Sequence, residues 1–324
     1  MSNKVLKPKK ASLYQFTQKY SNNIDNCIEF FKSMKWPEGF SCDRCGCHKY
    51  YLVKRVGKTK TSYVLECSSC HKQHSLLSGT IFQSCKLDLY KLLLGIFLFF
   101  NKNKGISAVE LCSILDVNYK TALLLENKCR ILMSLSNSDK LLNSLFYEAD
   151  VFNIGAKSKN KAGRASEQQP ILGILSTDKE NNYPRFIKLR LITDYTGLSL
   201  KKNIEKCCVL SHDALLNTDG EKGFNTLNEE IQVKNEKISY EEKDHRLLWL
   251  NIIIGNIKNN ITGIYHGITK REMPLFLNEQ EYRFNHRKMG KTIMDKIKKY
   301  LQRSFPISHR QIVYILNISA PHFS

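Results

Sequence analysis

Two C-x-x-C pairs near the amino terminus constrain the fold of this chain more than any other feature. Cys42 and Cys45 form the first pair, and Cys67 and Cys70 form the second. Each pair can place two thiolates on one tight turn, and two such turns can close a tetrahedral site with four sulfur ligands. Because such a site has no spare ligand position, the spacing predicts a structural Zn²⁺ and not a catalytic one.

The residues between the two pairs favour strands, which fits the two arms of a zinc ribbon. They include several aromatic and aliphatic side chains, namely Tyr50, Tyr51, Val53, Tyr63, Val64 and Leu65. Four unrelated structural cysteines are the alternative, and the doubled spacing disfavours it. Cys47 lies next to the first pair and is a possible alternative ligand, although its spacing fits less well.

The charge of the chain indicates a polyanionic partner. Its 324 residues leave room for two or three modules and contain 50 Lys and Arg against 30 Asp and Glu, a formal net charge of +20. Nucleic acid is the commonest partner of so basic a protein. A basic surface adjusted for solubility is the less favoured interpretation at this charge.

Neither secretion nor a membrane is expected. The first residues lack the apolar core of a signal peptide, and most cysteines outside the two pairs lie in apolar patterns typical of reduced thiols. The most hydrophobic run, Leu92 to Phe100, is too short to cross a bilayer and is flanked by Lys91 and Lys102. We therefore expect a buried helix there and a cytoplasmic protein.

The stretch from residue 24 to residue 135 contains helical patterns on both sides of the ribbon. Residues 24–35 form one amphipathic helix, which ends at Trp36-Pro37 because proline breaks the pattern. Three further helices are expected at Leu87–Phe100, from Ser107 to Leu115, and at Tyr119–Met133.

The last two of these helices match the geometry of a helix-turn-helix. Ser107 and Glu110 have the form of a capping box, and Asn118 can cap the second helix. The candidate DNA contacts on that second helix are Tyr119, Lys120, Lys128 and Arg130. The first two would face a groove and the last two the phosphates. An ordinary helical hairpin between two domains stays open as the alternative.

From residue 145 onward the pattern changes to strands followed by helices. Strands are expected at Leu145–Phe152, Gln169–Ser176, Phe186–Ile192 and within Val209–Thr218, with helices at Thr196–Cys207 and Leu247–Ile261. The order β-β-β-α-β-α is that of a ribonuclease-H-like core. A basic loop at residues 157–164 suits a phosphate backbone, with a solvated surface loop as the alternative. Its cations are Lys157, Lys159, Lys161 and Arg164.

Acidic residues of this core could bind divalent cations. Glu148 and Asp150 are two apart on the first strand and face the same way, while Asp219-Gly220 follows a later strand. Carboxylates from neighbouring strands can hold Mg²⁺ or Mn²⁺, and two such ions support phosphodiester cleavage. A turn Asp-Gly is usually only a turn. Asn256 lies on or beside the buried face of a helix, and chemistry alone favours an amide bonded to a neighbouring backbone.

Several segments together resemble bacterial insertion-sequence transposases of the Merlin/ISXO-like type. They are Cys27–Phe31, Lys35–Cys42, Ser75–Phe82, Lys104–Ala108, Tyr119–Ala122, Gly263–Gly267 and Tyr282–Arg287. The resemblance extends from about residue 24 to about residue 290. It implies a multidomain α+β protein, with an amino-terminal zinc ribbon, a helix-turn-helix, and an α/β ribonuclease-H-like, integrase-type catalytic core.

The resemblance also assigns catalytic positions. Asp150 and Asp219 match the two catalytic aspartates of the family, and Asn256 matches the third position, which often carries Asn in this type. The resemblance thus favours Asn256 as a ligand of Mg²⁺ or Mn²⁺, with Glu279 as a possible extra acid nearby. Two positions depart from the family, because Val151 replaces a usual Glu and Asn251 a usual His.

We therefore expect a transposase that binds terminal inverted repeats of double-stranded DNA, nicks them and transfers the 3′-hydroxyl ends into target DNA. Lys258 is a further candidate phosphate contact, and a homodimer or higher assembly is expected on DNA in the bacterial nucleoid. An inactive or domesticated copy that acts as a DNA-binding repressor is the alternative. The expected parts are a helical segment at 1–36, the ribbon at 37–84, the helix-turn-helix at 85–142, the core at 143–295 and a helical tail at 296–324.

Overall fold

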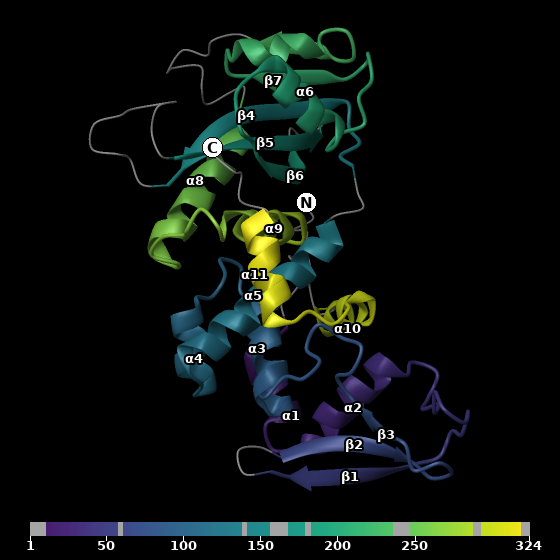
Figure 1. Ribbon diagram of the computed structural model, residues 1–324. Helices are drawn as coiled ribbons and strands as arrows, with labels where there is room; N and C mark the ends of the chain where they lie inside the picture. Colours follow the sequence, from purple (N-terminus) through teal and green to yellow (C-terminus); the bar gives the residue numbers. More distant parts are fainter. Residues whose placement is uncertain are drawn as a thin grey trace, which may run out of the picture. The chain divides into compact units, whose positions relative to one another are not determined.

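The computed structural model describes residues 11–57, 61–137, 141–155, 168–178, 183–235, 247–287 and 293–318. It divides the chain into two compact units, which are described separately (Figure 1). The first unit comprises residues 1–135 and 288–313, and the second comprises residues 136–287 and 314–324. The finer five-part division stays a prediction. In the described part of the chain, no helix has both the length and the apolar character needed to cross a membrane.

The first unit begins with two helices and a small sheet. Helices α1 (Leu13–Tyr20) and α2 (Ile24–Lys35) precede an antiparallel sheet of β1 (Tyr50–Val56), β2 (Thr61–Cys67) and β3 (Gln73–Ser75). The predicted helix at 24–35 is confirmed, and the Asn23 side chain caps it by accepting a hydrogen bond from the Asn26 N–H (3.3 Å). The sheet confirms the predicted ribbon.

Three helices follow the ribbon, as predicted. They are α3 (Leu89–Asn101), α4 (Ala108–Leu115) and α5 (Tyr119–Asn137). Ser107 caps α4 by accepting from the Glu110 N–H (3.2 Å), but the Glu110 carboxylate pairs with Lys102 and so only half of the predicted capping box is seen. Gly95 allows close packing of α3, because a Cβ there would lie 2.5 Å from Leu125 Cδ2 and the Leu125 side chain would have to move. The arrangement of α4, a tight turn and α5 agrees with a helix-turn-helix; its DNA-binding role stays a prediction.

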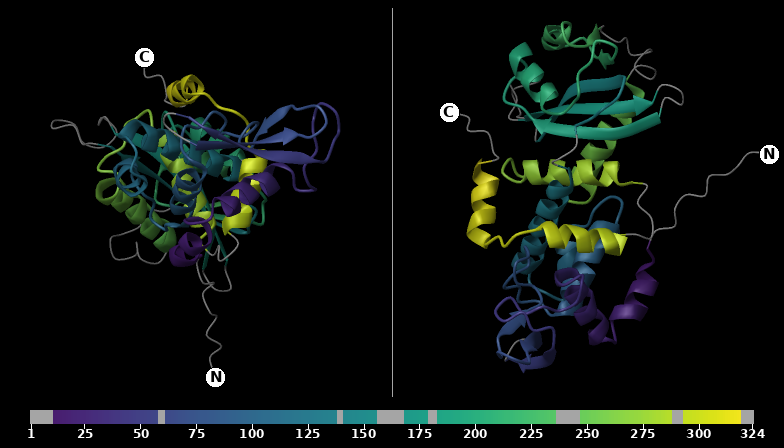
Figure 2. Two further views of the ribbon diagram at one scale, coloured as in Figure 1. Left: turned by 90° about the horizontal axis from the view of Figure 1, so that it is seen from below. Right: turned by 90° about the vertical axis from the view of Figure 1, so that its right-hand side faces the viewer.

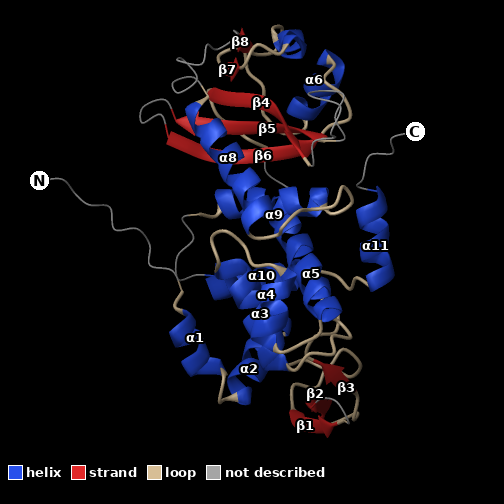
Figure 3. Cartoon of the chain, turned by 90° about the vertical axis from the view of Figure 1, so that its left-hand side faces the viewer, coloured by secondary structure: helices blue, strands red, loops and turns tan. Residues whose placement is uncertain are grey.

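The second unit is built on one five-stranded sheet (Figure 3). Its strands are β4 (Phe146–Ile154), β5 (Gln169–Asp178), β6 (Tyr183–Leu191), β7 (Leu215–Thr218) and β8 (Gln232–Asn235), in the spatial order β6-β5-β4-β7-β8. The first three strands pair antiparallel, while β7 and β8 pair parallel to β4 and to each other. This is the ribonuclease-H-like, integrase-type arrangement that the order of elements predicts.

Helices cover both faces of this sheet. They are α6 (Gly197–Glu205), α8 (Leu248–Gly263) and α9 (Met273–Asn285), with a short 3₁₀ helix, η2 (Lys222–Leu227). Along β4, Tyr147 and Ala149 pack in one apolar cluster with α6, while Phe152 and Ile154 pack in another with α8 and α9. Successive strand residues point to opposite faces, so Glu148 and Asp150 share the α8 face.

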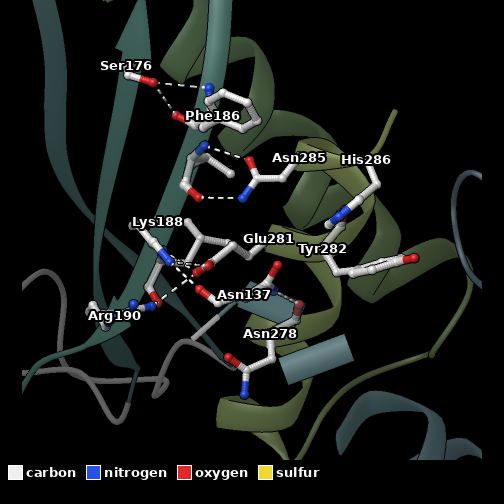
Figure 4. Close-up of polar contacts among 12 residues, drawn as sticks. Asn137, Ser176, Phe186, Lys188, Arg190, Asn278, Glu281, Tyr282, Asn285 and His286 are labelled. Atoms are coloured by element: carbon white, nitrogen blue, oxygen red, sulfur yellow. Dashed lines mark hydrogen bonds and ion pairs between the residues drawn. The ribbon is translucent and has the colours of Figure 1, made fainter. Parts of the chain in front are cut away.

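Helix α9 closes the edge of the sheet at β6 (Figure 4). The Asn285 amide accepts from the Ile187 N–H (2.8 Å) and donates to the Ile187 carbonyl (2.9 Å). Nearby, the buried Glu281 carboxylate lies 3.2 Å from Lys188 Nζ and 3.0 Å from Arg190 Nη1. An uncovered edge strand can pair with other chains. The contacts from α9 therefore protect the exposed backbone groups of edge strand β6.

Two helices near the carboxyl terminus complete the described chain. Helix α10 (Ile293–Arg303) belongs to the first unit and packs on α2 and α3. Helix α11 (His309–Ile318) follows it, and Figure 2 shows both in yellow. The sequence indicated a helical tail here but not that α10 packs against helices from the other end of the chain.

Candidate active site and metal centre

The four predicted zinc ligands lie together in the first unit. The Sγ atoms of Cys42, Cys45, Cys67 and Cys70 are all within 4.8 Å of one another, and the closest pairs, Cys42–Cys70 and Cys45–Cys67, are 3.5 Å apart. Four thiolates around one Zn²⁺ at about 2.3 Å require sulfur atoms this close. The donor set therefore fits a structural zinc site, as the C-x-x-C spacing predicts.

Local contacts favour the thiolate form of Cys42. Burial acts to raise the pKa of its thiol, but hydrogen bonds from the backbone of Arg44 and Cys45 and from His74 lower that pKa to about 6. The His74 ring is buried, and its Nδ1 lies 3.7 Å from an Asp43 carboxylate oxygen. A thiolate is the form that binds metal.

Cys47 lies outside the group of four. Its Sγ lies 3.5 Å from Ser68 Oγ and 3.7 Å from the Lys49 carbonyl oxygen. The described residues therefore assemble a zinc site without Cys47 as a ligand. Cys47 instead lies beside the two C-x-x-C pairs.

The two predicted catalytic aspartates belong to the sheet region of the second unit: Asp150 lies on β4, and Asp219 lies directly after β7. Strands β4 and β7 pair in parallel register up to Ala149–Thr218, which is the pair directly before Asp150 and Asp219. Neighbouring strands lie roughly 4.8 Å apart, and paired residues point to the same face. Asp150 therefore lies on the face that α8 covers, and Asp219 follows the neighbouring strand at the same level of the sheet.

Helix α8 runs alongside β4 and carries Asn256. Near its start, the Leu250 N–H donates to Glu148 Oε2 (2.9 Å), and further along Lys258 Nζ lies 5.8 Å from the Phe152 ring centroid. Along α8, Asn256 lies between the two residues that make these contacts, Leu250 and Lys258. Along β4, Asp150 lies between their partners, Glu148 and Phe152. Asn256 is exposed, and no hydrogen bond joins its amide to another described residue. The alternative of an amide bonded to a neighbouring backbone is therefore not seen.

The first departure from the family pattern, Val151, contacts the Asp150 carboxylate through its backbone, because the Val151 N–H donates to Asp150 Oδ1 (2.7 Å). Val151 is an odd-numbered residue of β4 and packs against the apolar cluster on the opposite face. Asn251 is exposed on the first turn of α8, next to Leu250. The Val151 side chain therefore lies on the opposite face of the sheet from Asp150.

Glu279 is not available as an extra acid. It is fully buried on α9, where it pairs with Arg283 (2.7 Å) and accepts a hydrogen bond from Tyr265 Oη (2.5 Å). A buried carboxylate with two such partners is neutralised within the fold. The resemblance suggested Glu279 as a possible extra acid near the metal site. The structure corrects this, because the Glu279 carboxylate is already paired inside the protein.

Two family models match the chain. One describes an ISXO2-like transposase domain and matches residues 146–285, which contain both aspartates and Asn256. The other describes a transposase zinc-ribbon domain and matches residues 23–73, which contain all four cysteines. The chain belongs to the ISXO2-like transposases. This membership implies a polynucleotidyl transferase kind of activity.

The solved structures that match this transposase include one at low identity. It is a crystal structure of a pre-cleavage Mos1 transpososome, with 10% identity, a TM-score of 0.27, and coverage of 67% of this chain and 75% of that chain. No curated protein matches. The family assignment therefore depends on the two family models.

The predicted DNA contacts of α5 divide into two groups. Tyr119 and Lys120 are exposed at its first turn. Lys128 is buried, with Nζ 2.6 Å from the Ile81 carbonyl oxygen, and Arg130 is buried in an ion pair with Glu126 (2.5 Å). The prediction that Lys128 and Arg130 contact phosphates is therefore wrong, because both cations are used inside the protein.

The remaining predicted contacts belong to the second unit. Lys258 is exposed on α8 beside the Phe152 ring. Lys157, Lys159, Lys161 and Arg164 lie outside the described residues. Their role as phosphate contacts stays a prediction.

The positive charge of this transposase is concentrated in the first unit. That unit contains 28 Lys and Arg against 10 Asp and Glu, whereas the second contains 22 against 20. Composition alone did not reveal this partition, because residues 288–313 join the first unit only in the folded chain. Nearly all of the excess charge thus belongs to the ribbon and its helices.

Proposed function

We propose that the first unit of this transposase binds the terminal inverted repeats of its mobile element and that Asp150, Asp219 and Asn256 of the second unit carry out strand cleavage and transfer. The main support is the parallel register of β4 and β7, which ends at Ala149–Thr218, the pair directly before Asp150 and Asp219. The charge of the first unit supports its part, because duplex DNA attracts a strongly basic surface.

The three side chains offer oxygen donors that suit Mg²⁺ or Mn²⁺. Two carboxylates supply negative charge, and the Asn256 carbonyl oxygen adds a neutral ligand. Two such ions, when bound, activate the attacking oxygen and stabilise the leaving oxygen of a phosphodiester. Lys258 would hold a backbone phosphate beside them.

The reaction has two steps at this one site. Water first cleaves a phosphodiester at the element end and leaves a 3′-hydroxyl. That hydroxyl then attacks a phosphodiester of the target DNA and displaces a target 3′-oxygen, so no covalent protein–DNA intermediate forms. Because two ends must be joined, the active form on DNA is at least a dimer.

The test uses labelled DNA from both flanks of the gene with Mg²⁺ and the full zinc-loaded chain. Asp150→Ala and Asp219→Ala should each reduce nicking and joining to background while leaving end binding in gel shifts largely intact. Asp213→Ala removes an exposed acid just before β7 and should behave as wild type. Joining retained in both Asp150→Ala and Asp219→Ala would refute the assignment.

A DNA-binding repressor without catalysis is the second candidate. The departures at Val151 and Asn251 favour it, although the Val151 side chain packs on the face opposite Asp150. Binding of the element ends without Mg²⁺-dependent nicking, by folded and zinc-loaded protein, would support this candidate. Nicking without joined products would instead indicate a nuclease of the same fold.

A further inference from the structure

Helix α10 is an integral part of the first unit, although it comes from the far end of the chain. Its buried side chains are Ile293, Ile297, Tyr300 and Leu301. The Tyr300 ring stacks with the Phe100 ring of α3 (centroids 6.0 Å apart), and Gln302 Nε2 donates to the Met34 carbonyl oxygen of α2 (2.9 Å). The helix is therefore held against both α2 and α3.

Two further polar contacts fix the rotation of α10 about its axis. Lys298 Nζ donates to Ser33 Oγ (3.0 Å) and lies 5.7 Å from the Phe30 ring centroid. Ser304, just after the helix, accepts a hydrogen bond from the Ile81 N–H (3.1 Å). Lys298 is thus used inside the unit, and the direction of the remaining α10 side chains is set.

Three cations form a stripe along the helix next to its buried side. Lys296, Lys299 and Arg303 follow the spacing i, i+3, i+7, which places them on one side of a helix. Lys299 and Arg303 are exposed, and Lys296 is half-buried. Among the described residues, none of the three forms an ion pair, and Asp295 on the first turn pairs with none of them.

The stripe is electrostatically unfavourable in the free protein. Like charges one helical turn apart destabilise a helix. Burial is the larger cause and the Lys299 charge the smaller cause that together lower the pKa of Lys296. An anionic partner would compensate the repulsion among these three cations, because the helix holds them in place without counter-charges.

We propose that Lys296, Lys299 and Arg303 contact the DNA backbone, so that α10 completes the DNA-binding surface of the first unit. The inference rests on the proposed function, and it adds a surface that neither the ribbon nor α5 supplies. The stripe spans roughly 10 Å along the helix, and duplex DNA carries one charge per about 1.7 Å of its axis. An acidic protein segment fits the same charges, but the +18 balance of the whole unit favours the larger polyanion.

The experiment compares two triple variants of the full zinc-loaded chain. Lys296→Gln, Lys299→Gln and Arg303→Gln together remove the stripe, and Lys202→Gln, Lys206→Gln and Lys222→Gln remove three exposed cations of the second unit. Binding to a random-sequence duplex is measured between about 50 and 200 mM salt. The stripe variant should bind at least about tenfold more weakly at 50 mM, and its log–log salt slope should fall by about 2 to 3. The control should change the slope by less than about 1.

Two additional variants separate a lost contact from a lost fold. Lys296→Arg with Lys299→Arg keeps the charges and should retain the wild-type slope. Lys299→Gln alone should reduce the slope by about 0.9 without a change in melting temperature. If the stripe and control variants bind alike while wild type binds well, the α10 contact is refuted and the proposed function stands. If wild type binds no duplex at all, both fall.

Discussion

Glu148 is a buried carboxylate on the same face of β4 as Asp150. Only 4% of the residue is exposed, and its Oε2 accepts the Leu250 N–H at 2.9 Å. Burial raises the pKa of this carboxyl from 4.5 to about 7, although the Leu250 hydrogen bond lowers it in part. The group is therefore largely protonated in the folded chain at mildly acidic pH, where an unfolded chain would ionise it.

The raised pKa of Glu148 makes stability fall as pH rises. The contribution is fully present below about pH 4.5 and is lost as pH rises to about 7, because the unfolded state releases the proton first. The loss amounts to at most roughly 3 kcal/mol of unfolding free energy. Glu148→Gln should remove this fall in denaturant titrations without added divalent cations, whereas Glu205→Gln, an exposed change on α6, should keep it. An unchanged pH profile in Glu148→Gln would contradict the burial effect.

Asn235, at the end of β8, ties together both sides of the turn that carries Asp219. Its Oδ1 accepts from Thr218 Oγ1 (2.7 Å), and its Nδ2 donates to the Glu221 carbonyl (2.9 Å) and to Asn225 Oδ1 (2.7 Å). Gly220 within the turn has φ of +69°, a conformation that few other residues adopt. Asn235 thus holds the residues before and after Asp219, and we infer that it supports the position of the Asp219 carboxylate.

We expect Asn235→Ala to impair catalysis through Asp219. Nicking should slow by about 10- to 100-fold, the size typical of lost support for a metal ligand, and the Mn²⁺ concentration needed for half-maximal nicking should rise. DNA-end affinity should not change. The matched control is Thr226→Val, which loses hydrogen bonds to Gly197 and Gly223 elsewhere around η2. An equal rise in Mn²⁺ requirement in Thr226→Val would show a general loosening of the loop instead.

Sequence patterns were least reliable for predicting the roles of individual side chains. Lys128 and Arg130 were interpreted as phosphate contacts because helical spacing does not tell whether a cation faces solvent or a buried carbonyl. Asn235 gave no signal, since its three partners become neighbours only in the folded sheet. Asp150 and Asp219 stay predictions as metal ligands, but strand context correctly indicated that they follow paired residues of β4 and β7.

At the scale of elements, the ribbon is the part whose fold depends most on a metal. Its sheet has three short strands, and no residue of β1 is buried. So small a sheet buries little apolar area, and structural zinc supplies the missing folding energy in such domains. Cys42 and Cys45 lie before the start of β1, Cys67 ends β2, and Cys70 lies just before β3, so one zinc ion would link all three strands.

Zinc removal should therefore unfold the ribbon and leave the second unit intact. With a chelator, or in Cys45→Ser, the slowly exchanging amides of β2 should exchange more than about tenfold faster. The amides of β5, in the other unit, serve as the internal reference, and Cys47→Ser should behave as wild type. If the amides of β2 stay equally protected from exchange after verified zinc loss, the ribbon does not need the metal to fold.

Elements with clear end signals were predicted well. The boundaries of α2 are as expected because Asn23 and Trp36-Pro37 mark them, and Ser107 and Asn118 mark α4 and α5. Strand β8 was missed because four residues with one apolar side chain give no period. Helix α9 was missed because buried Glu279, Gln280 and Glu281 resemble a solvent-exposed face until their partners are known.

For the whole molecule, the main consequence of the fold is that the two ends of the sequence share one unit. Ile293, Ile297, Tyr300 and Leu301 of α10 bury their side chains in the unit that contains α2 and α3. Each fully buried apolar side chain contributes about 1.5 to 3 kcal/mol. The stability of the amino-terminal module should thus depend on residues more than 190 positions downstream of α3.

Truncation tests this dependence. A chain ending at residue 287 lacks α10 and should lose at least about 5 kcal/mol of stability in the first unit, because the apolar surfaces of α2 and α3 become exposed. Hydrogen exchange should accelerate in α2 and α3 but not in β4 and β5. A chain ending at residue 304 lacks α11 yet keeps α10, so it should protect α2 and α3 as the full chain does. Equal protection of these helices in both truncations would mean that α10 does not stabilise the first unit, and its cations would then have no fixed position from which to meet DNA.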